Sequence, residues 1–209
     1  LGFDGKSLSL GIQGTNEGYL DLTYDDVSFA TRINRSDKTG TLAFAYGDKS
    51  IDFGVETDGG YLNLELSSDL KFETGFNTGG SAYLGIVSGS NEFSLSGDKS
   101  SGAGAIALKV DGLDMSLDAN TTDNSAFFTI NTGGIDLNVG GEAGKSGLFH
   151  LAENGNEYDL AVDLESNSGN IGYVFNGGSD YFKADLVDGE NGTLSFKHDE
   201  NEFSLYGNA

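Results

Sequence analysis

The sequence of 209 residues contains no cysteine, no proline and no tryptophan, and it has a single methionine. The absence of cysteine excludes disulfide scaffolds, thiolate-bound zinc and cysteine nucleophiles. No apolar run approaches the ~18 residues that a transmembrane helix needs. The two histidines, His150 and His198, are too few for a histidine-rich metal centre. We therefore expect no resident cofactor.

Basic residues are also scarce, and this separates the chain from nucleic-acid-binding proteins. Lys and Arg number 11 against 33 Asp and Glu, so the formal net charge is -22. Such a surface repels phosphate backbones, which excludes nucleic acid as a partner. The aromatic content of 11% is typical of a folded chain. No shift in composition marks an internal boundary, so we predict one domain over residues 1–209.

The chain is rich in apolar and polar residues that alternate with a period of two, which is the pattern of a β-strand. Ile51, Phe53 and Val55 show this alternation, and so do Leu113 and Met115. Clusters of Gly, Asp, Asn and Ser interrupt the pattern at regular intervals. This rhythm predicts about 19 short strands in roughly nine hairpin units of about 20–23 residues.

The candidate turns agree with this rhythm, because residues that flank a two-residue hairpin loop pair and share a face. Five turns place residues of the apolar face opposite one another: Asp25-Asp26 (Tyr24 with Val27), Asp58-Gly59 (Val55 with Leu62), Asp111-Gly112 (Leu108 with Met115), Asn154-Gly155 (Leu151 with Tyr158) and Asn167-Ser168 (Leu164 with Ile171). We therefore predict an all-β fold, an antiparallel up-and-down meander. The alternative is a β-solenoid with coils of about 22 residues.

The alternation divides the side chains between two faces, one of which is apolar. The other face carries carboxylates, which we assign as a lumen or acidic face: Asp21, Asp52, Glu56, Glu65, Glu73, Asp114, Asp118, Asp136, Asp159, Asp163 and Asp185. We predict that the meander closes into a barrel, because closure removes its sheet edges, and a barrel of this strand number encloses a wide lumen. With apolar residues outward and acids inward, the barrel suits a lipid bilayer.

A second asymmetry concerns the strand ends. Connections at one end are mostly two residues long, whereas the other end has longer ones, as at 97–104 and 140–147. Aromatic residues of the apolar face gather at the short-turn end as a predicted aromatic belt: Tyr24, Tyr46, Phe93, Tyr158, Phe175, Phe182, Phe196 and Phe203. Short turns with aromatic rings at one end and longer loops at the other are typical of outer-membrane barrels.

In rhythm and composition the chain resembles the bacterial outer-membrane porins over most of its length. The resemblance rests on stretches such as 18–26 (GYLDLTYDD) and 192–198 (GTLSFKH), and no signature motif accompanies it. It implies an outer-membrane pore that passes small hydrophilic solutes by diffusion, with a lipid bilayer as its partner. Fixed negative charge in the lumen would favour cations.

A second interpretation stays open, because the apolar band is thin. Three to four outward residues per strand, tilted by ~40°, cover roughly 15–19 Å, against ~25 Å in an outer-membrane barrel. The alternative is a non-enzymatic secreted or cell-surface structural or adhesive protein. It would self-associate as a homo-oligomer in a matrix or filament. A third option is a lipid-binding trough with its apolar face inward.

No motif predicts catalysis. The segment 140–147 contains Gly-Lys-Ser, but Val139 stands where a phosphate-binding loop requires glycine. Asp114 and Asp118, four residues apart on one strand, would lie about 13 Å from each other, too far for a glycosidase pair. Turns at 188–192 and 199–202 offer hard oxygen ligands, so weak Ca²⁺ binding is the metal interaction that we expect. We expect no enzyme.

Overall fold

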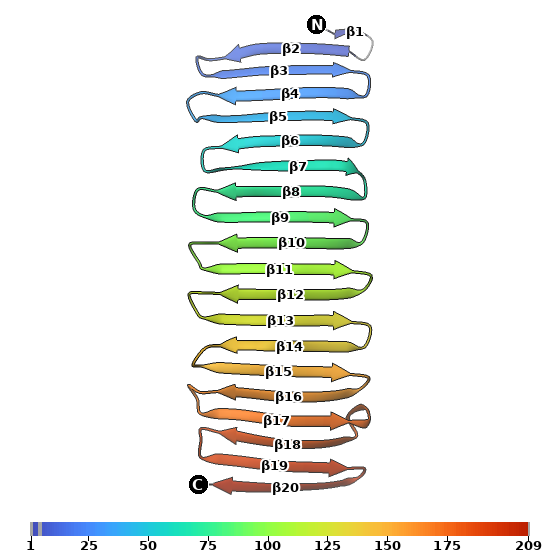
Figure 1. Ribbon diagram of the computed structural model, residues 1–209, viewed down its shortest axis with the longest axis vertical. Helices are drawn as coiled ribbons and strands as arrows, with labels where there is room; N and C mark the ends of the chain where they lie inside the picture. The colour runs from blue at the N-terminus through green and yellow to red at the C-terminus, as the bar shows by residue number, and fades with distance from the viewer. Residues whose placement is uncertain (1, 4–5, 209) are drawn as a thin grey trace. The chain divides into compact units, whose positions relative to one another are not determined.

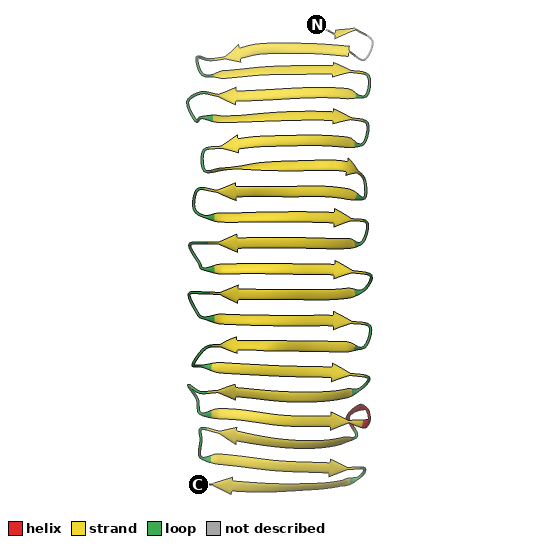
Figure 2. Cartoon of the chain, in the orientation of Figure 1, coloured by secondary structure: helices red, strands yellow, loops and turns green. Residues whose placement is uncertain are grey.

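The computed structural model describes residues 2–3 and 6–208, which form twenty strands and one turn of 3₁₀ helix (Figures 1 and 2). The chain divides into two compact units, residues 1–100 and 101–209, and each is described by itself. No helix in the described part of the chain is long and apolar enough to cross a membrane.

The first unit is an antiparallel meander in which each strand pairs with the strand before it and the strand after it. Its strands are β1 (Gly2–Phe3), β2 (Lys6–Gln13), β3 (Glu17–Tyr24), β4 (Val27–Asn34), β5 (Thr39–Tyr46), β6 (Lys49–Glu56), β7 (Gly59–Ser67), β8 (Leu70–Asn77), β9 (Ser81–Ser88) and β10 (Asn91–Asp98). A register shift between Glu65 and Ser67 interrupts the pairing of β7 with β8.

The second unit repeats this architecture. Its elements are β11 (Ala103–Val110), β12 (Leu113–Asn120), β13 (Ser125–Thr132), β14 (Ile135–Glu142), β15 (Ser146–Glu153), β16 (Asn156–Asp163), β17 (Ser168–Phe175), η1 (Asn176–Gly178), β18 (Asp180–Val187), β19 (Asn191–His198) and β20 (Asn201–Asn208). The one helical turn, η1, joins β17 to β18 and is coloured red in Figure 2.

The predicted all-β, antiparallel up-and-down meander is confirmed within each unit. Strands β2 to β20 are eight or nine residues long, and their antiparallel pairing excludes a solenoid of parallel coils. Among the described residues, no hydrogen-bonded pairing closes either unit on itself. Closure into a barrel therefore stays a prediction.

Three of the five predicted turn registers are confirmed. Tyr24 pairs with Val27, Leu108 with Met115, and Leu151 with Tyr158. At the turns Asp111-Gly112 and Asn154-Gly155 both residues have positive φ, as a type I′ turn requires.

The other two turn predictions are wrong. Val55 pairs with Gly60 instead of Leu62, because Gly59 belongs to β7 and the turn is Thr57-Asp58. Gly59 approaches the next strand closely: a Cβ there would lie 2.2 Å from the carbonyl oxygen of Phe76. This glycine therefore serves strand packing rather than a left-handed turn.

Ile171 pairs with Leu160 instead of Leu164, because the loop before β17 has four residues rather than two. The side chain of Asp163 closes this loop by accepting hydrogen bonds from the backbone N–H groups of Glu165 and Ser166. Side-chain capping of this kind competes with a tight hairpin.

The predicted long connection at 140–147 is also shorter than expected. Residues 140–142 belong to β14 and 146–147 to β15, which leaves a loop of residues 143–145. Connections at the two strand ends of each unit still differ, since two-residue turns dominate one end and loops of up to four residues occur at the other.

Candidate functional site

The apolar face of each unit is built from rows of side chains that pair across successive strands. In the second unit, one row contains Leu108, Met115, Ile130, Leu137, Leu151, Tyr158, Tyr173, Phe182, Phe196 and Phe203. The next row contains Ile106, Leu117, Phe128, Val139, Phe149, Leu160, Ile171, Ala184, Leu194 and Leu205. We call these two rows, with their counterparts in the first unit, the apolar stripe.

The first unit presents the same arrangement. Its rows are Leu8, Leu22, Phe29, Phe44, Ile51, Leu64, Phe72, Ile86 and Phe93, followed by Leu10, Leu20, Thr31, Leu42, Phe53, Leu62, Thr74, Leu84 and Leu95. Two rows lie ~7 Å apart along the strands, so with its side-chain width the stripe is about 13 Å wide.

Smaller residues border the stripe along one side. In the second unit this border is mostly glycine and alanine, as at Gly104, Ala119, Ala126, Gly141 and Gly147. In the first unit it alternates large and small residues, as at Ile33, Gly40, Val55 and Gly60. Continuous rows of large apolar side chains are thus limited to the stripe, and the border of the first unit adds separate ones such as Ile33 and Val55.

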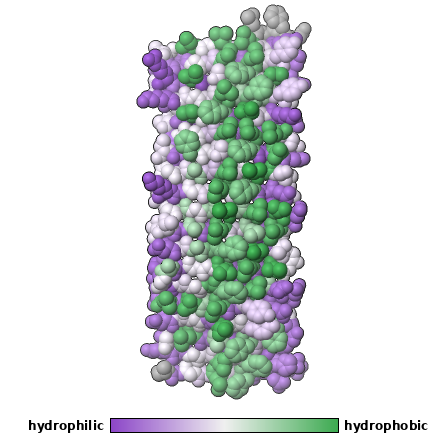
Figure 3. Space-filling view, in the orientation of Figure 1, coloured by the Kyte–Doolittle hydropathy of each residue, from purple (hydrophilic) through white to green (hydrophobic). Residues whose placement is uncertain are grey.

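The apolar stripe has no layer of protein over it. Among the described residues no hydrophobic side chain is buried, and Leu10, Leu160 and Phe203 keep 68%, 52% and 56% of their surface exposed. Within each unit the apolar side chains form a band across the strands, with hydrophilic residues toward the strand ends (Figure 3). Exposed apolar areas of this extent mark interaction sites.

Four residues of the predicted aromatic belt lie together in one row of the apolar stripe of the second unit. Tyr158, Phe182, Phe196 and Phe203 occupy neighbouring strands of a single row, together with Tyr173, which the predicted belt did not include. The rings of Tyr158 and Tyr173 stack with centroids 4.4 Å apart.

The remaining belt residues lie at different depths along the strands. Phe93 belongs to the corresponding row of the first unit. Tyr24 and Tyr46 lie one row nearer the strand ends, and Phe175 stacks on Tyr173 with centroids 5.0 Å apart.

Every residue of the predicted acidic face lies on the face opposite the apolar stripe, as the register of its strand requires. Asp52 and Glu73, for example, flank Asn63 on neighbouring strands, and Asp185 lies between Asn170 and Thr193. None of these carboxylates is paired directly with another one in the assigned registers. This spacing limits like-charge repulsion across the strands.

Three of the predicted acidic residues form ion pairs with basic side chains. Asp21 binds Arg32 through two hydrogen bonds, Glu65 lies 3.1 Å from Lys71 Nζ, and Asp159 contacts His150. The hydrogen bond from Arg32 to Asp21 raises the pKa of this guanidinium further. Arg32 is exposed and Asp21 is partly exposed, so we assign this pair little stabilising weight.

Tyrosine rings on the acidic face cover glycines of adjacent strands. Tyr19, Tyr61 and Tyr83 lie over Gly11, Gly54 and Gly75, where an added Cβ would approach ring atoms to within 2.3–2.8 Å. Each ring fills the place of the missing side chain and shields the backbone, a device that stabilises glycine in strands. Burial raises the pKa of Tyr61, and the nearby carboxylates of Asp52 and Glu56 add to the effect.

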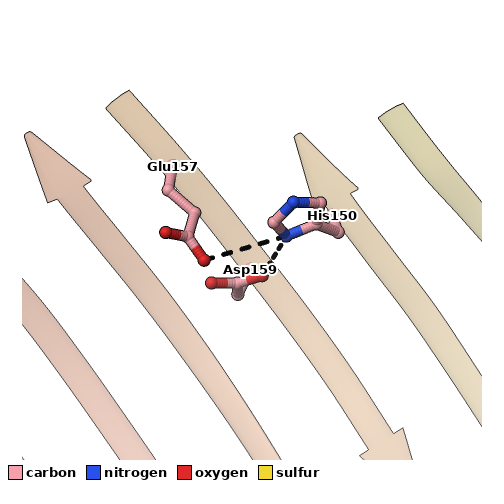
Figure 4. Close-up of side chains that lie close together, drawn as sticks. All are labelled: His150, Glu157 and Asp159. Atoms are coloured by element: carbon pink, nitrogen blue, oxygen red, sulfur yellow. Dashed lines mark hydrogen bonds and ion pairs between the residues drawn. The ribbon is translucent and has the colours of Figure 1, made fainter. Parts of the chain in front are cut away.

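Three titratable side chains converge at the centre of the acidic face of the second unit (Figure 4). His150 on β15 pairs with Asp159 on β16, and its Nδ1 lies 2.7 Å from Asp159 Oδ1 and 4.0 Å from Glu157 Oε1. The hydrogen bond with Asp159 raises the pKa of His150, and partial desolvation opposes this rise. On the other side of His150, Asn138 of β14 is its direct partner.

A second group surrounds Asp180, the one polar side chain that is buried among the described residues. Its carboxylate accepts hydrogen bonds from the backbone N–H of Asp199 and the amide of Asn176, and it contacts His198 Nδ1. These donors, led by the Asp199 N–H, lower the pKa of Asp180. Asp180 thereby ties η1 to the β19–β20 turn, so we assign it a structural role.

Neither predicted calcium turn brings a set of carboxylates together. The groups of three possible metal-ligating side chains in the described residues are His150 with Glu157 and Asp159, and Asp180 with His198 and Asp199. Of the turns, 199–202 contributes Asp199 and 188–192 contributes nothing.

The chain matches no protein-family model and no curated protein sequence.

Proposed function

We propose that this chain is a non-enzymatic structural protein of the cell surface or extracellular space, which assembles by packing the apolar stripe of one copy on that of another. The uncovered stripe is the observation that carries this proposal. Two sheets that pack face to face lie ~10 Å apart and interdigitate their apolar side chains. That arrangement supplies the hydrophobic core that neither unit has alone.

The size of the stripe suits such an interface. Nine full-length strands of the first unit at ~4.8 Å spacing give about 43 Å, and a width of about 13 Å makes ~560 Å², while the ten strands of the second unit make about 620 Å². Including the bordering row of small residues brings this to about 850 Å². A standard protein interface takes ~800 Å² from each partner, and most crystal-packing contacts take less than half of that.

The distribution of charge is compatible with a second copy as the occupant. With a net charge of -22, two copies repel each other at long range. The strands of the first unit place only Lys6 and Lys49 among charged residues on the apolar face, both in its end row. Face-to-face packing leaves the acidic faces outward and in solvent, where salt screens them.

The width of the stripe separates this proposal from the outer-membrane pore. A transmembrane β-strand needs ~9–11 residues and an apolar band of ~25 Å. Strands β2 to β20 have eight residues, or nine in β7, and they carry two continuous rows of large side chains. A second sheet covers such a band fully, whereas a bilayer leaves polar strand ends within hydrocarbon.

The pore nevertheless has one observation in its favour, which is that the predicted acidic residues all share one face. In a closed barrel this face would line a cation-favouring lumen. The two functions make opposite predictions for the purified chain.

Light scattering after size-exclusion chromatography in detergent-free buffer tests the proposal. We expect a dimer or larger assembly that is soluble without detergent and gives no conductance in planar bilayers. A chain that requires detergent and conducts cations would overturn the structural function in favour of the pore. A detergent-free monomer would overturn assembly through the stripe.

A further inference from the structure

We propose that His150, Glu157, Asp159 and Asn138 form a binding site for a divalent transition-metal ion of the zinc type on the acidic face of the second unit. The site is independent of the proposed assembly, because it lies on the face opposite the apolar stripe. Its ligand atoms come from three adjacent strands, β14, β15 and β16, which hold them in a fixed register.

The distances fit a small tetrahedral cation. Zinc binds imidazole nitrogen and carboxylate oxygen at ~2.0–2.2 Å, so two ligand atoms of a tetrahedral site lie about 3.4 Å apart. His150 Nδ1 lies 2.7 Å from Asp159 Oδ1 and 4.0 Å from Glu157 Oε1, values on either side of that separation. One ligand atom from each of the three side chains falls within 4.8 Å of the others.

Asn138 provides an independent observation. Its Oδ1 is shielded from solvent and has no hydrogen-bond partner among the described residues. A shielded carbonyl oxygen without a partner is costly, and bound cations are one way to satisfy it. Asn138 pairs directly with His150 on the same face, so its side chain lies beside the imidazole on the β14 side.

The ligand set selects the class of metal. An imidazole nitrogen with carboxylate and amide oxygens suits zinc and neighbouring transition metals, whereas calcium takes oxygen ligands only. Toward β17, Asp159 pairs with Gly172, a buried glycine against which the side chains of Asp159 and Lys183 both pack. Binding displaces the proton from His150 Nδ1, so the ion takes the place of the hydrogen bond to Asp159.

The group around Asp180 offers a contrast within the same unit. Asp180 has its acceptor positions occupied by Asp199, Asn176 and His198, and its side chain holds a loop in place. We therefore assign metal binding to the His150 group alone.

The two histidines make the test selective, because His198 serves as an internal control. Titrating the full chain with ZnCl₂ in an NMR experiment that observes histidine rings should shift the resonances of His150 at one equivalent and leave those of His198 unchanged. Equal shifts of both rings, or no shift at stoichiometric zinc, would overturn the proposal. Displacement of the bound zinc by an equal concentration of Ca²⁺ would also overturn the proposal.

Variants locate the ligands. His150→Gln and Asp159→Asn should each weaken zinc binding at least tenfold by calorimetry, and Asn138→Ala should weaken it several-fold. Asp114→Asn removes one charge from the same face outside the site and should change affinity less than twofold. If Asp114→Asn weakens binding as much as Asp159→Asn while circular dichroism shows all variants folded, zinc is held by diffuse negative charge and the site does not exist.

Discussion

Replacing Leu160 by glutamate should dissociate the proposed assembly, whereas the same substitution at Ala161 should not. Leu160 lies in the apolar stripe with 52% of its surface exposed, and Ala161 follows it on the acidic face, between Leu148 and Asn170. Both variants add one negative charge to β16. They differ in the face that receives the charge and in the size of the side chain that is replaced.

The expected magnitude follows from the surface that packing would bury. Complete burial of a leucine side chain contributes ~1.5–3 kcal/mol. The exposed half of Leu160 therefore contributes about 1 kcal/mol per copy, or about 2 kcal/mol in a symmetric dimer. That loss weakens dimerisation at least ~30-fold, and desolvating an unpaired carboxylate weakens it further.

Sedimentation velocity over a concentration series measures this effect. We expect Leu160→Glu to shift the monomer–dimer transition to at least ~30-fold higher concentration, with the Ala161→Glu transition close to that of the unchanged chain. Equal behaviour of the two variants would refute assembly through the stripe. Phe44→Glu and Ala43→Glu provide the same comparison in the first unit, where these residues also occupy opposite faces.

Three further predictions concern stability. Gly54→Ala should destabilise the first unit by about 1–3 kcal/mol in urea denaturation, because its Cβ would lie 2.3 Å from the Tyr61 ring. The control is Gly85→Ala, whose Cβ meets nothing nearer than 4.0 Å and which should leave the stability nearly unchanged. Gly155→Ala should cost about 1 kcal/mol in thermal unfolding because φ is +80° there, whereas Gly147→Ala, with no positive φ, should cost less. The carboxylate of Asp180 has a lowered pKa in the folded chain. Its stabilisation of η1 is therefore present above the unfolded-state pKa of ~3.9 and is lost as pH falls through the folded-state pKa. Hydrogen exchange of the Asp199 amide should show this loss in the unchanged chain and not in Asp180→Asn.

Turn chemistry made much of the fold predictable from sequence, and its failures have identifiable causes. The Asp-Gly and Asn-Gly turns fixed the register wherever both residues take positive φ, as at Asp111-Gly112. The register slipped at Gly59, where glycine serves close strand contact, and at Asn167, where Asp163 caps a longer loop. Both causes depend on neighbouring strands or on side-chain hydrogen bonds, which alternation does not encode.

The candidate sites were predictable to different degrees. Assignment of carboxylates to one face needed only the period of two, and each predicted acidic residue lies there. The turn at Asn154-Gly155 that pairs Leu151 with Tyr158 also pairs His150 with Asp159, so sequence reasoning had the signal for this contact and missed it. The shielded oxygen of Asn138 depends on side-chain conformation, which has no sequence signature.

The alternation of apolar and polar residues could not predict whether the sheet closes into a barrel. It also could not predict what covers the apolar stripe. Curvature and strand stagger decide whether a sheet closes, and alternation specifies neither. Alternation likewise indicates that one face is apolar without indicating whether lipid or protein covers it.

Spin labelling tests the central claim most directly, because the chain has no cysteine of its own. A nitroxide on Leu194→Cys reports on the apolar stripe, and one on Ser195→Cys reports on the opposite face. In detergent-free buffer we predict an immobile label at position 194 that a water-soluble nickel complex does not reach, and a mobile, accessible label at 195. A label at 194 that is accessible in buffer, or that becomes oxygen-accessible when liposomes are added, would contradict the account.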